Sequence, residues 1–204
     1  MKLLNRASYV IDAKITRDTV IFFDMDGTLV ETDYANFLSF EKAIQFVKGR
    51  TFNLVFDPEM RLNRSNLKAF IPDLNCGEYK KIIEKKQTFY KDFIDKTELN
   101  PILASIVNDY SITNQLILVT NCREERAFET LNHFGLVDKF SHVFYRQFND
   151  QGERINKYQN AISKLGILSE MAIAFENEEV EITDAKLAGI KIINPQIIKK
   201  NDPF

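Results

Sequence analysis

The chain has 204 residues, of which 45% are hydrophobic and 27% are charged, and its formal net charge is −2 at pH 7. A chain of this length can form one full core and a small second domain, and its charge provides no excess of cations for nucleic acid. No apolar run reaches the roughly 18 residues of a membrane-spanning helix. Cys76 and Cys122 fit neither a disulfide framework nor a zinc site. We therefore expect a cytoplasmic protein without a signal peptide that binds neither nucleic acid nor membranes.

The first strong pattern is an apolar run over residues 20–23 that stops at two carboxylates. Residues 1–18 before it mix apolar and charged positions, and we expect a short helix there. Asp24 and Asp26 lie two residues apart, so in an extended chain their side chains leave the same face. Gly27 and Thr28 then predict a turn. This places both carboxylates at the carboxyl end of a strand, where open parallel sheets bind ligands.

Two neighbouring carboxylates repel each other unless a cation, a shared proton or strong hydrogen bonds stabilise them. Mg²⁺ prefers oxygen ligands and keeps waters or phosphate in its shell. With such an ion, one aspartate can attack as a nucleophile while the other transfers protons. The alternative is a D-x-D-G turn whose aspartates only stabilise a loop. The apolar strand before this turn favours the functional interpretation.

Residues 31–105 have helical rather than strand periodicity. One helix is expected over 31–48, ended by Gly49, and a second over 78–95, with a less regular segment between them. In the second helix Lys86 interrupts an apolar stripe, four residues after Ile82 and four before Tyr90. We therefore expect Lys86 to face the inside of this segment, although a snorkelling lysine is the alternative.

Strands and helices alternate through the rest of the chain. Strands are expected over 116–119, 142–145, 171–175 and 190–193, and helices after residue 121 and over 157–165 and 182–188. In the first of these helices, the residues expected to face inward are Ala127, Phe128, Leu131 and Phe134. The pattern predicts an α/β fold: a Rossmann-like core of five parallel strands with helices on both faces.

Three further segments place polar residues where strands end or helices begin. Thr120 ends the second core strand, so its hydroxyl is expected beside Asp24; a Thr that caps the next helix is the alternative. Lys157 begins a helix after a polar loop, where a solvated lysine is the alternative to a functional one. Glu176 and Asn177 open the acidic stretch E-N-E-E-V-E after the fourth strand. That stretch can ligate a metal or be a solvated loop.

The segment F-D-M-D-G-T-L-V resembles motif I of the haloacid dehalogenase (HAD) superfamily of phosphotransferases. This resemblance implies that Asp24 is a nucleophile that forms an aspartyl-phosphate and that Asp26 is the general acid and base. L-V-T-N resembles motif II, which implies that Thr120 binds the transferring phosphoryl group, and Asn121 can donate to the same oxygens. Lys157 resembles the motif III lysine, which implies that it neutralises the charge of the nucleophile and of the phosphate.

The stretch A-F-E-N-E-E-V-E-I-T-D-A-K-L-A-G-I resembles motif IV, with departures from the family pattern. The resemblance implies an Mg²⁺ ion held by Asp24, Asp26, Glu176 and Asn177, with Asp26 contributing its backbone carbonyl. Most members have an aspartate where this chain has Asn177, and Glu181 takes the second acidic position. The asparagine removes one negative charge, so we expect weaker metal affinity. Tyr158 follows Lys157 where the family often has proline.

The resemblance also implies that residues 31–105 are a small helical cap inserted into a core domain made of 1–30 and 106–204. In the β-phosphoglucomutase-like branch, cap Arg and Lys side chains hold the non-transferring phosphate, and Arg64 and Lys86 resemble them. Arg123, just after motif II, is another candidate anion ligand.

The expected function is Mg²⁺-dependent hydrolysis of a small phosphorylated metabolite, a phosphomonoester such as a sugar phosphate or a nucleotide-like compound. The alternatives are a sugar-phosphate mutase and a non-catalytic phosphometabolite-binding protein. Asn36 stands where the mutases of the branch have histidine, which disfavours the mutase. The oligomeric state stays open.

Overall fold

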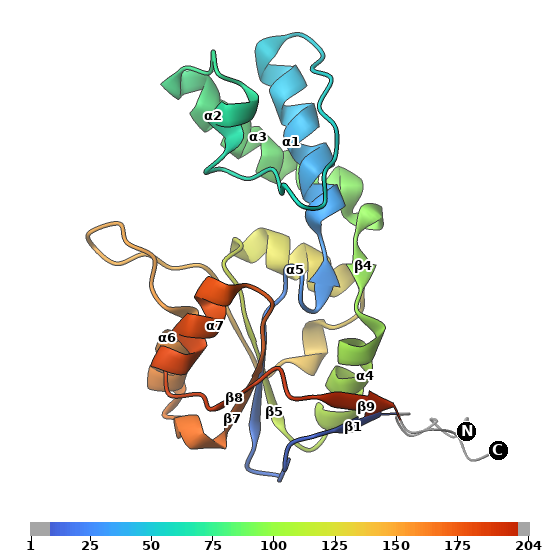
Figure 1. The fold of residues 1–204 in the computed structure, drawn as a ribbon, viewed down its shortest axis with the longest axis vertical. Coiled ribbons are helices and arrows are strands. Elements are labelled where there is room, and N and C mark those ends of the chain that lie inside the picture. Colours follow the sequence, from blue (N-terminus) through green and yellow to red (C-terminus); the bar gives the residue numbers. More distant parts are fainter. Residues whose placement is uncertain (1–8, 200–204) are drawn as a thin grey trace, which may run out of the picture. The chain divides into compact units, whose positions relative to one another are not determined.

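The computed structural model describes residues 9–199, which form two compact units (Figure 1). The core unit contains the chain up to Leu29 and from Leu99 onward, and the insert unit is Val30–Glu98. The insert therefore ends before residue 105. Asn100 caps helix α4 (Pro101–Tyr110) by accepting from the backbone N–H groups of Ile102 and Leu103, and this helix belongs to the core unit.

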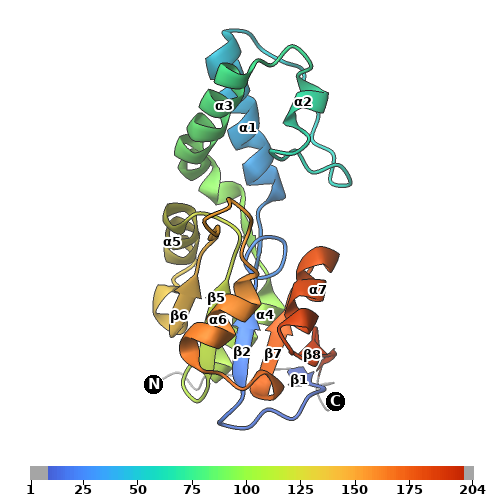
Figure 2. The ribbon, with the colours of Figure 1, turned by 90° about the vertical axis from the view of Figure 1, so that its left-hand side faces the viewer.

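The core unit is built on one five-stranded sheet (Figure 2). Its strands, in the spatial order β6-β5-β2-β7-β8, are His142–Phe144, Gln115–Val119, Val20–Phe23, Ala172–Phe175 and Ile192–Ile193. All four neighbouring pairs are parallel. Phe23, the last residue of β2, lies opposite Leu118 of β5 and Phe175 of β7. The prediction of five parallel strands is confirmed, with the aspartate-bearing strand in the middle.

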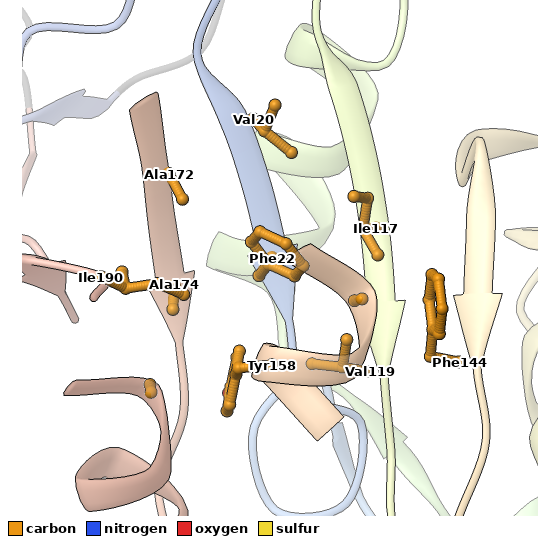
Figure 3. Packing of buried hydrophobic residues seen from close by; sticks show 11 residues of the cluster. Val20, Phe22, Ile117, Val119, Phe144, Tyr158, Ala172, Ala174 and Ile190 are labelled. Atoms are coloured by element: carbon orange, nitrogen blue, oxygen red, sulfur yellow. The ribbon is translucent and has the colours of Figure 1, made fainter. Parts of the chain in front are cut away.

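Helices cover both faces of this sheet, as predicted. Helices α6 (Lys157–Leu165) and α7 (Glu179–Leu187) lie on one face and α4 on the other (Figure 1). Alternate strand residues point toward α6 and α7 and pack there with Tyr158, Ala161 and Ala185 (Figure 3). This follows from the period of two along a strand. The sheet therefore lies between two layers of helices (Figure 1), and its carboxyl edge carries the residues that follow the strands.

Helix α5 (Glu124–His133) corrects one expected core residue. Its buried positions are Ala127, Thr130 and Leu131, whereas Phe128 is 53% exposed. A residue one position after Ala127 is rotated by about 100° around the helix axis. Phe128 therefore lies off the buried stripe despite its apolar side chain.

The part of the chain before β2 also differs from the expected short helix. Residues 1–8 lie outside the described residues, and β1 (Tyr9–Ile11) is a strand that pairs antiparallel with β9 (Ile197–Lys199). Its partner comes from the other end of the chain, so local sequence does not determine this conformation. Two further short strands, β3 (Val30–Glu31) and β4 (Glu98–Leu99), pair where the chain leaves and re-enters the core unit.

The insert unit is helical and has its own hydrophobic core. It consists of α1 (Asp33–Lys48), α2 (Leu67–Phe70), α3 (Cys76–Tyr90) and the 3₁₀ helix η1 (Lys91–Lys96). The core unit holds two further 3₁₀ turns, Val137–Lys139 and Ser169–Met171. Within residues 9–199, each helix is too short or too polar to cross a bilayer.

Candidate active site

A buried ion pair joins the central strand to helix α6. Asp24 follows β2 directly and is 5% exposed, and its backbone N–H donates to the carbonyl of Phe175. The Lys157 Nζ lies 2.6 Å from the Asp24 Oδ1. Asn156 caps α6 by accepting from the N–H groups of Tyr158 and Gln159, so the helix begins at Lys157 and directs this side chain toward the carboxyl edge of the sheet. The sequence predicted both residues at this edge.

Lys157 contacts two further carboxylates. Its Nζ lies 2.6 Å from the Glu176 Oε2 and 3.5 Å from the Glu181 Oε2, and Glu181 also pairs with Arg154 at 2.7 Å. Burial disfavours the charged form of Lys157, but Asp24 and Glu176 outweigh this effect and raise the pKa of the ammonium. The pKa of Asp24 is raised to about 7, because burial, together with the charges of Glu176 and Asp26, outweighs the lowering effect of Lys157. A bound cation would favour the ionised form of this carboxylate.

Asp26 forms an ion pair with Arg126 of α5. The pair is nearly buried, with 13% of the Asp26 side chain and 11% of the Arg126 side chain exposed. Arg126 is not among the residues expected at the site, because nothing local in the sequence relates it to Asp26, which lies 100 positions away.

Thr120 and Asn121 follow β5 and lie at the same edge as Asp24, since β5 is the parallel neighbour of β2. Thr120 is fully buried, and its hydroxyl accepts from the backbone N–H of Cys122 at 3.2 Å. The N-cap residue of α5 is Arg123, so Thr120 does not cap that helix. The Asn121 Oδ1 is buried and has no hydrogen-bond partner among the described residues. The Arg123 side chain is exposed at the start of α5.

The loop after β7 and the first turn of α7 contain both buried and exposed acidic residues. Glu176 is 1% exposed and Glu181 is 4% exposed, whereas Asn177, Glu178 and Glu179 are exposed. The alternative of a solvated acidic loop therefore holds for Asn177, Glu178 and Glu179, but not for the buried Glu176 and Glu181. The Asn177 Oδ1 accepts from the hydroxyl of Thr28 at 2.9 Å, which connects this loop to the turn after β2.

Gly27 allows these two loops to approach closely. It has φ = 79°, and a Cβ at this position would lie 2.5 Å from the Asn177 Nδ2. Both the backbone conformation and the space therefore require glycine. The side-chain amide of Asn194, which follows β8, pairs with the backbone of Glu176: it accepts from the N–H at 2.9 Å and donates to the carbonyl at 2.5 Å.

Arg64 and Lys86 belong to the insert unit. Arg64 is half-buried, and its carbonyl accepts from the Tyr79 hydroxyl at 3.3 Å. Lys86 is 5% exposed, its Nζ donates to the Asn36 Oδ1, and it lies 5.2 Å from the ring centroid of Tyr90. The inward position predicted for Lys86 is confirmed.

The oxygen atoms at this edge fit a hard metal cation that takes one carboxylate and several carbonyl oxygens as ligands. Within residues 9–199, no three Asp, Glu, His or Cys side chains converge as a metal-binding group. The Lys157 ammonium contacts the Asp24 Oδ1, which leaves the Oδ2 as a potential ligand. Mg²⁺ is commonly bound through one or two carboxylates together with waters and substrate phosphate. Asp24, with carbonyl oxygens of Asp26 and Asn177, is a donor set of this kind.

Comparison with known proteins agrees with this geometry. The family model described as haloacid dehalogenase-like hydrolase matches residues 21–194. This chain belongs to that family. The resemblance in motif I is thereby confirmed, the chain is a HAD-like hydrolase, and the helical insert after β2 is the small cap of this fold. No curated protein matches the chain.

Solved structures with this fold include several HAD proteins. A haloacid dehalogenase-like hydrolase from Streptococcus pneumoniae is 18% identical with a TM-score of 0.67, over 87% of this chain and 84% of its own. CbbY from Rhodobacter sphaeroides, solved with phosphate, is 20% identical with a TM-score of 0.68, and the match covers 92% of this chain and 87% of CbbY. A protein from Haemophilus somnus 129PT, described as a predicted phosphoglycolate phosphatase, is 20% identical with a TM-score of 0.66. The match covers 86% of this chain and 84% of that protein. At these identities the likeness concerns the fold.

Proposed function

We propose that this HAD-like hydrolase is a phosphatase that hydrolyses a small phosphomonoester, a sugar phosphate or a nucleotide-like metabolite, through an aspartyl-phosphate on Asp24. The observation that carries the proposal is the buried contact of 2.6 Å between Lys157 and Asp24 at the carboxyl edge of the sheet. A nucleophilic carboxylate and a dianionic phosphoryl group repel each other. A fixed ammonium beside the nucleophile reduces that repulsion and stabilises the charge of the transition state.

In the first step a carboxylate oxygen of Asp24 attacks phosphorus, and the substrate oxygen leaves with a proton from Asp26. In the second step Asp26 takes a proton from a water molecule, which attacks the phosphorus of the aspartyl-phosphate and restores Asp24. The Arg126 guanidinium favours the ionised form of Asp26. Asp26 must therefore carry a proton, with this ion pair loosened, before it protonates the leaving group, and the pair can form again once the proton has left.

Polar groups from the neighbouring strand can bind the phosphoryl oxygens. Thr120 can supply a hydroxyl and Asn121 the NH₂ group of its amide as donors at this edge, whereas the unsatisfied Asn121 Oδ1 is an acceptor and requires a donor as its partner. Arg123, Arg64 and Lys86 are our candidates for binding the rest of an anionic substrate, because their side chains can neutralise a second negative group.

The proposed cofactor is Mg²⁺. Asp24 and the Asp26 carbonyl would hold it together with the carbonyl oxygen of Asn177, and Glu176 is the fourth residue expected from the sequence. When bound, Mg²⁺ supplies positive charge to the transferring phosphoryl group.

The contacts of Asn36 support hydrolysis over a mutase reaction. Its Oδ1 accepts from Lys86, and its Nδ2 donates to the Thr32 hydroxyl at 3.1 Å. An asparagine amide cannot take up and release a proton as a histidine can, so this position lacks the proton-transfer chemistry of the residue found in the mutases. The buried contact between Asp24 and Lys157 argues in turn against a non-catalytic binding protein, because binding alone does not require an activated nucleophile.

The test is the release of inorganic phosphate from para-nitrophenyl phosphate, with Mg²⁺ and with a chelator, followed by a panel of sugar phosphates and nucleotides. We expect Mg²⁺-dependent release that Asp24→Asn abolishes, because the amide is not a nucleophile. Asp18→Asn is the matched control, since Asp18 is exposed and precedes β2 at the opposite edge of the sheet. Turnover that persists in Asp24→Asn would refute the nucleophile assignment.

A further inference from the structure

Tyr158 connects the hydrophobic core to the charged cluster. The side chain is fully buried, and its ring packs edge-on against Phe22 of β2, with the ring centroids 6.0 Å apart (Figure 3). Its hydroxyl donates to the Glu176 Oε2 at 2.9 Å. Burial and the Glu176 charge raise the pKa of this phenol far above its ordinary value, so the hydroxyl keeps its proton. A rigid donor is thus presented to Glu176 from inside the core.

Glu176 is surrounded by hydrogen-bond donors. Its Oε1 accepts from the backbone N–H groups of Asn177 at 2.9 Å and Glu178 at 3.1 Å. Its Oε2 contacts the Tyr158 hydroxyl and the Lys157 ammonium. A carboxylate offers about four lone-pair positions, and these donors use them. A metal ion bound directly to Glu176 would have to displace one of these donors inside a buried site, where lost hydrogen bonds are costly.

We propose that Tyr158 and Glu176 are positioning residues for Lys157 and that Glu176 is not a direct Mg²⁺ ligand. The Lys157 side chain has several rotatable bonds, and the equal distances of 2.6 Å to Asp24 and Glu176 hold its ammonium between them. If Glu176 turned toward a metal ion, the ammonium could shift toward the carboxylate of Glu181, which lies 3.5 Å away. Tyr158 opposes that rotation and keeps Lys157 on the nucleophile.

This inference rests on the proposed phosphatase function and has two consequences. First, Asp24 supplies the one carboxylate of the metal site, and the other protein ligands are neutral carbonyl oxygens. Second, the tyrosine at the position where the family often has proline contributes to catalysis through Glu176, without contact to substrate.

A double-mutant cycle between Tyr158→Phe and Glu176→Gln tests the positioning role. We expect each variant to lower kcat for para-nitrophenyl phosphate about 10- to 100-fold, the range for loss of a hydrogen bond to a charged group, with KM changed less. Because both act through one contact, the double variant should be no slower than Glu176→Gln alone. Independent effects that multiply would overturn the proposal.

The phenylalanine keeps the ring packed against Phe22, so Tyr158→Phe should fold. Thermal unfolding measures the folded fraction of each variant, and kcat is corrected for it. Tyr110→Phe is the matched control, because Tyr110 ends α4 ahead of β5, at the opposite edge of the sheet. An equal fall of kcat in this control would indicate a general effect of losing a hydroxyl and would also overturn the proposal.

The metal claim is tested by a crystal structure of the wild-type protein at saturating Mg²⁺, which does not depend on turnover. Both Glu176 oxygens should keep the donors named above. A Glu176 oxygen at the about 2.1 Å typical of Mg²⁺ ligands would overturn the claim. If the wild-type protein releases no phosphate, the proposed function fails, whereas this structural result still decides the role of Glu176.

Discussion

Replacement of Lys157 by methionine should strongly destabilise the core unit. Methionine has a similar length and remains apolar, so the substitution removes the ammonium with little loss of packing. Three carboxylates then face one another: the side chains of Asp24, Glu176 and Glu181 are 7%, 0% and 6% exposed. Water cannot screen them, and Arg154 compensates Glu181 alone.

The magnitude follows from this burial. Removing one partner of a buried ion pair costs about 3–5 kcal/mol, because it leaves an uncompensated charge. For a chain of this length, each kcal/mol lowers the melting temperature by about 2–4 °C, so the expected decrease is about 6–20 °C. Lys42→Met is the matched control. Its pair with Asp92 has a length of 2.9 Å, but both side chains are well exposed, at 44% and 39%, and such pairs contribute about 0–1 kcal/mol.

The assay is urea and thermal unfolding of both variants and of the wild type in the presence of a chelator, so that no cation replaces the ammonium. A Lys157→Met protein as stable as Lys42→Met would show that the three carboxylates are not held in a buried, charged cluster. The electrostatic reasoning for the site would then be wrong.

Two further changes test the motif IV loop. Asn177→Asp restores a negative charge beside the proposed metal, so calorimetric titration should show Mg²⁺ binding about tenfold tighter; unchanged affinity would place the ion elsewhere. Gly27→Ala should lower the free energy of unfolding by about 1–3 kcal/mol and more than Gly152→Ala. The two glycines have φ near 80°, but a Cβ at Gly27 meets Asn177 whereas nothing lies within 4 Å at Gly152. Equal losses in urea unfolding would argue against the close approach of the two loops.

Much of the fold follows from local patterns in the chain. The apolar runs around Phe22 and Ile117 end at polar residues, and in a parallel sheet the carboxyl ends of all strands meet at one edge. Asp24, Thr120 and Glu176 are therefore brought to one edge by topology alone. The start of α6 was also predictable, because Asn156 is a good N-cap and Lys157 follows it.

Other features depend on orientations that periodicity does not specify. The exposure of Phe128 depends on the rotation of α5 against the sheet, and the strand at Tyr9–Ile11 depends on a partner near residue 198. Arg126 reaches Asp26 across 100 positions of sequence. A single sequence contains no record of such a pair before the packing of α5 is known.

By itself the sequence determined the five core strands and their order along the chain, the helical insert, and the set of charged groups at the carboxyl edge, because these depend on hydrophobic period and strand direction. Only the tertiary structure decided which groups share a proton or a charge: Lys157 between Asp24 and Glu176, Arg126 on Asp26, and the Tyr158 hydroxyl on Glu176. The physical reason is that these interactions differ in how precisely the atoms must be placed. Hydrophobic burial tolerates shifts of an ångström, whereas hydrogen bonds and buried ion pairs require their atoms to be within about 3 Å.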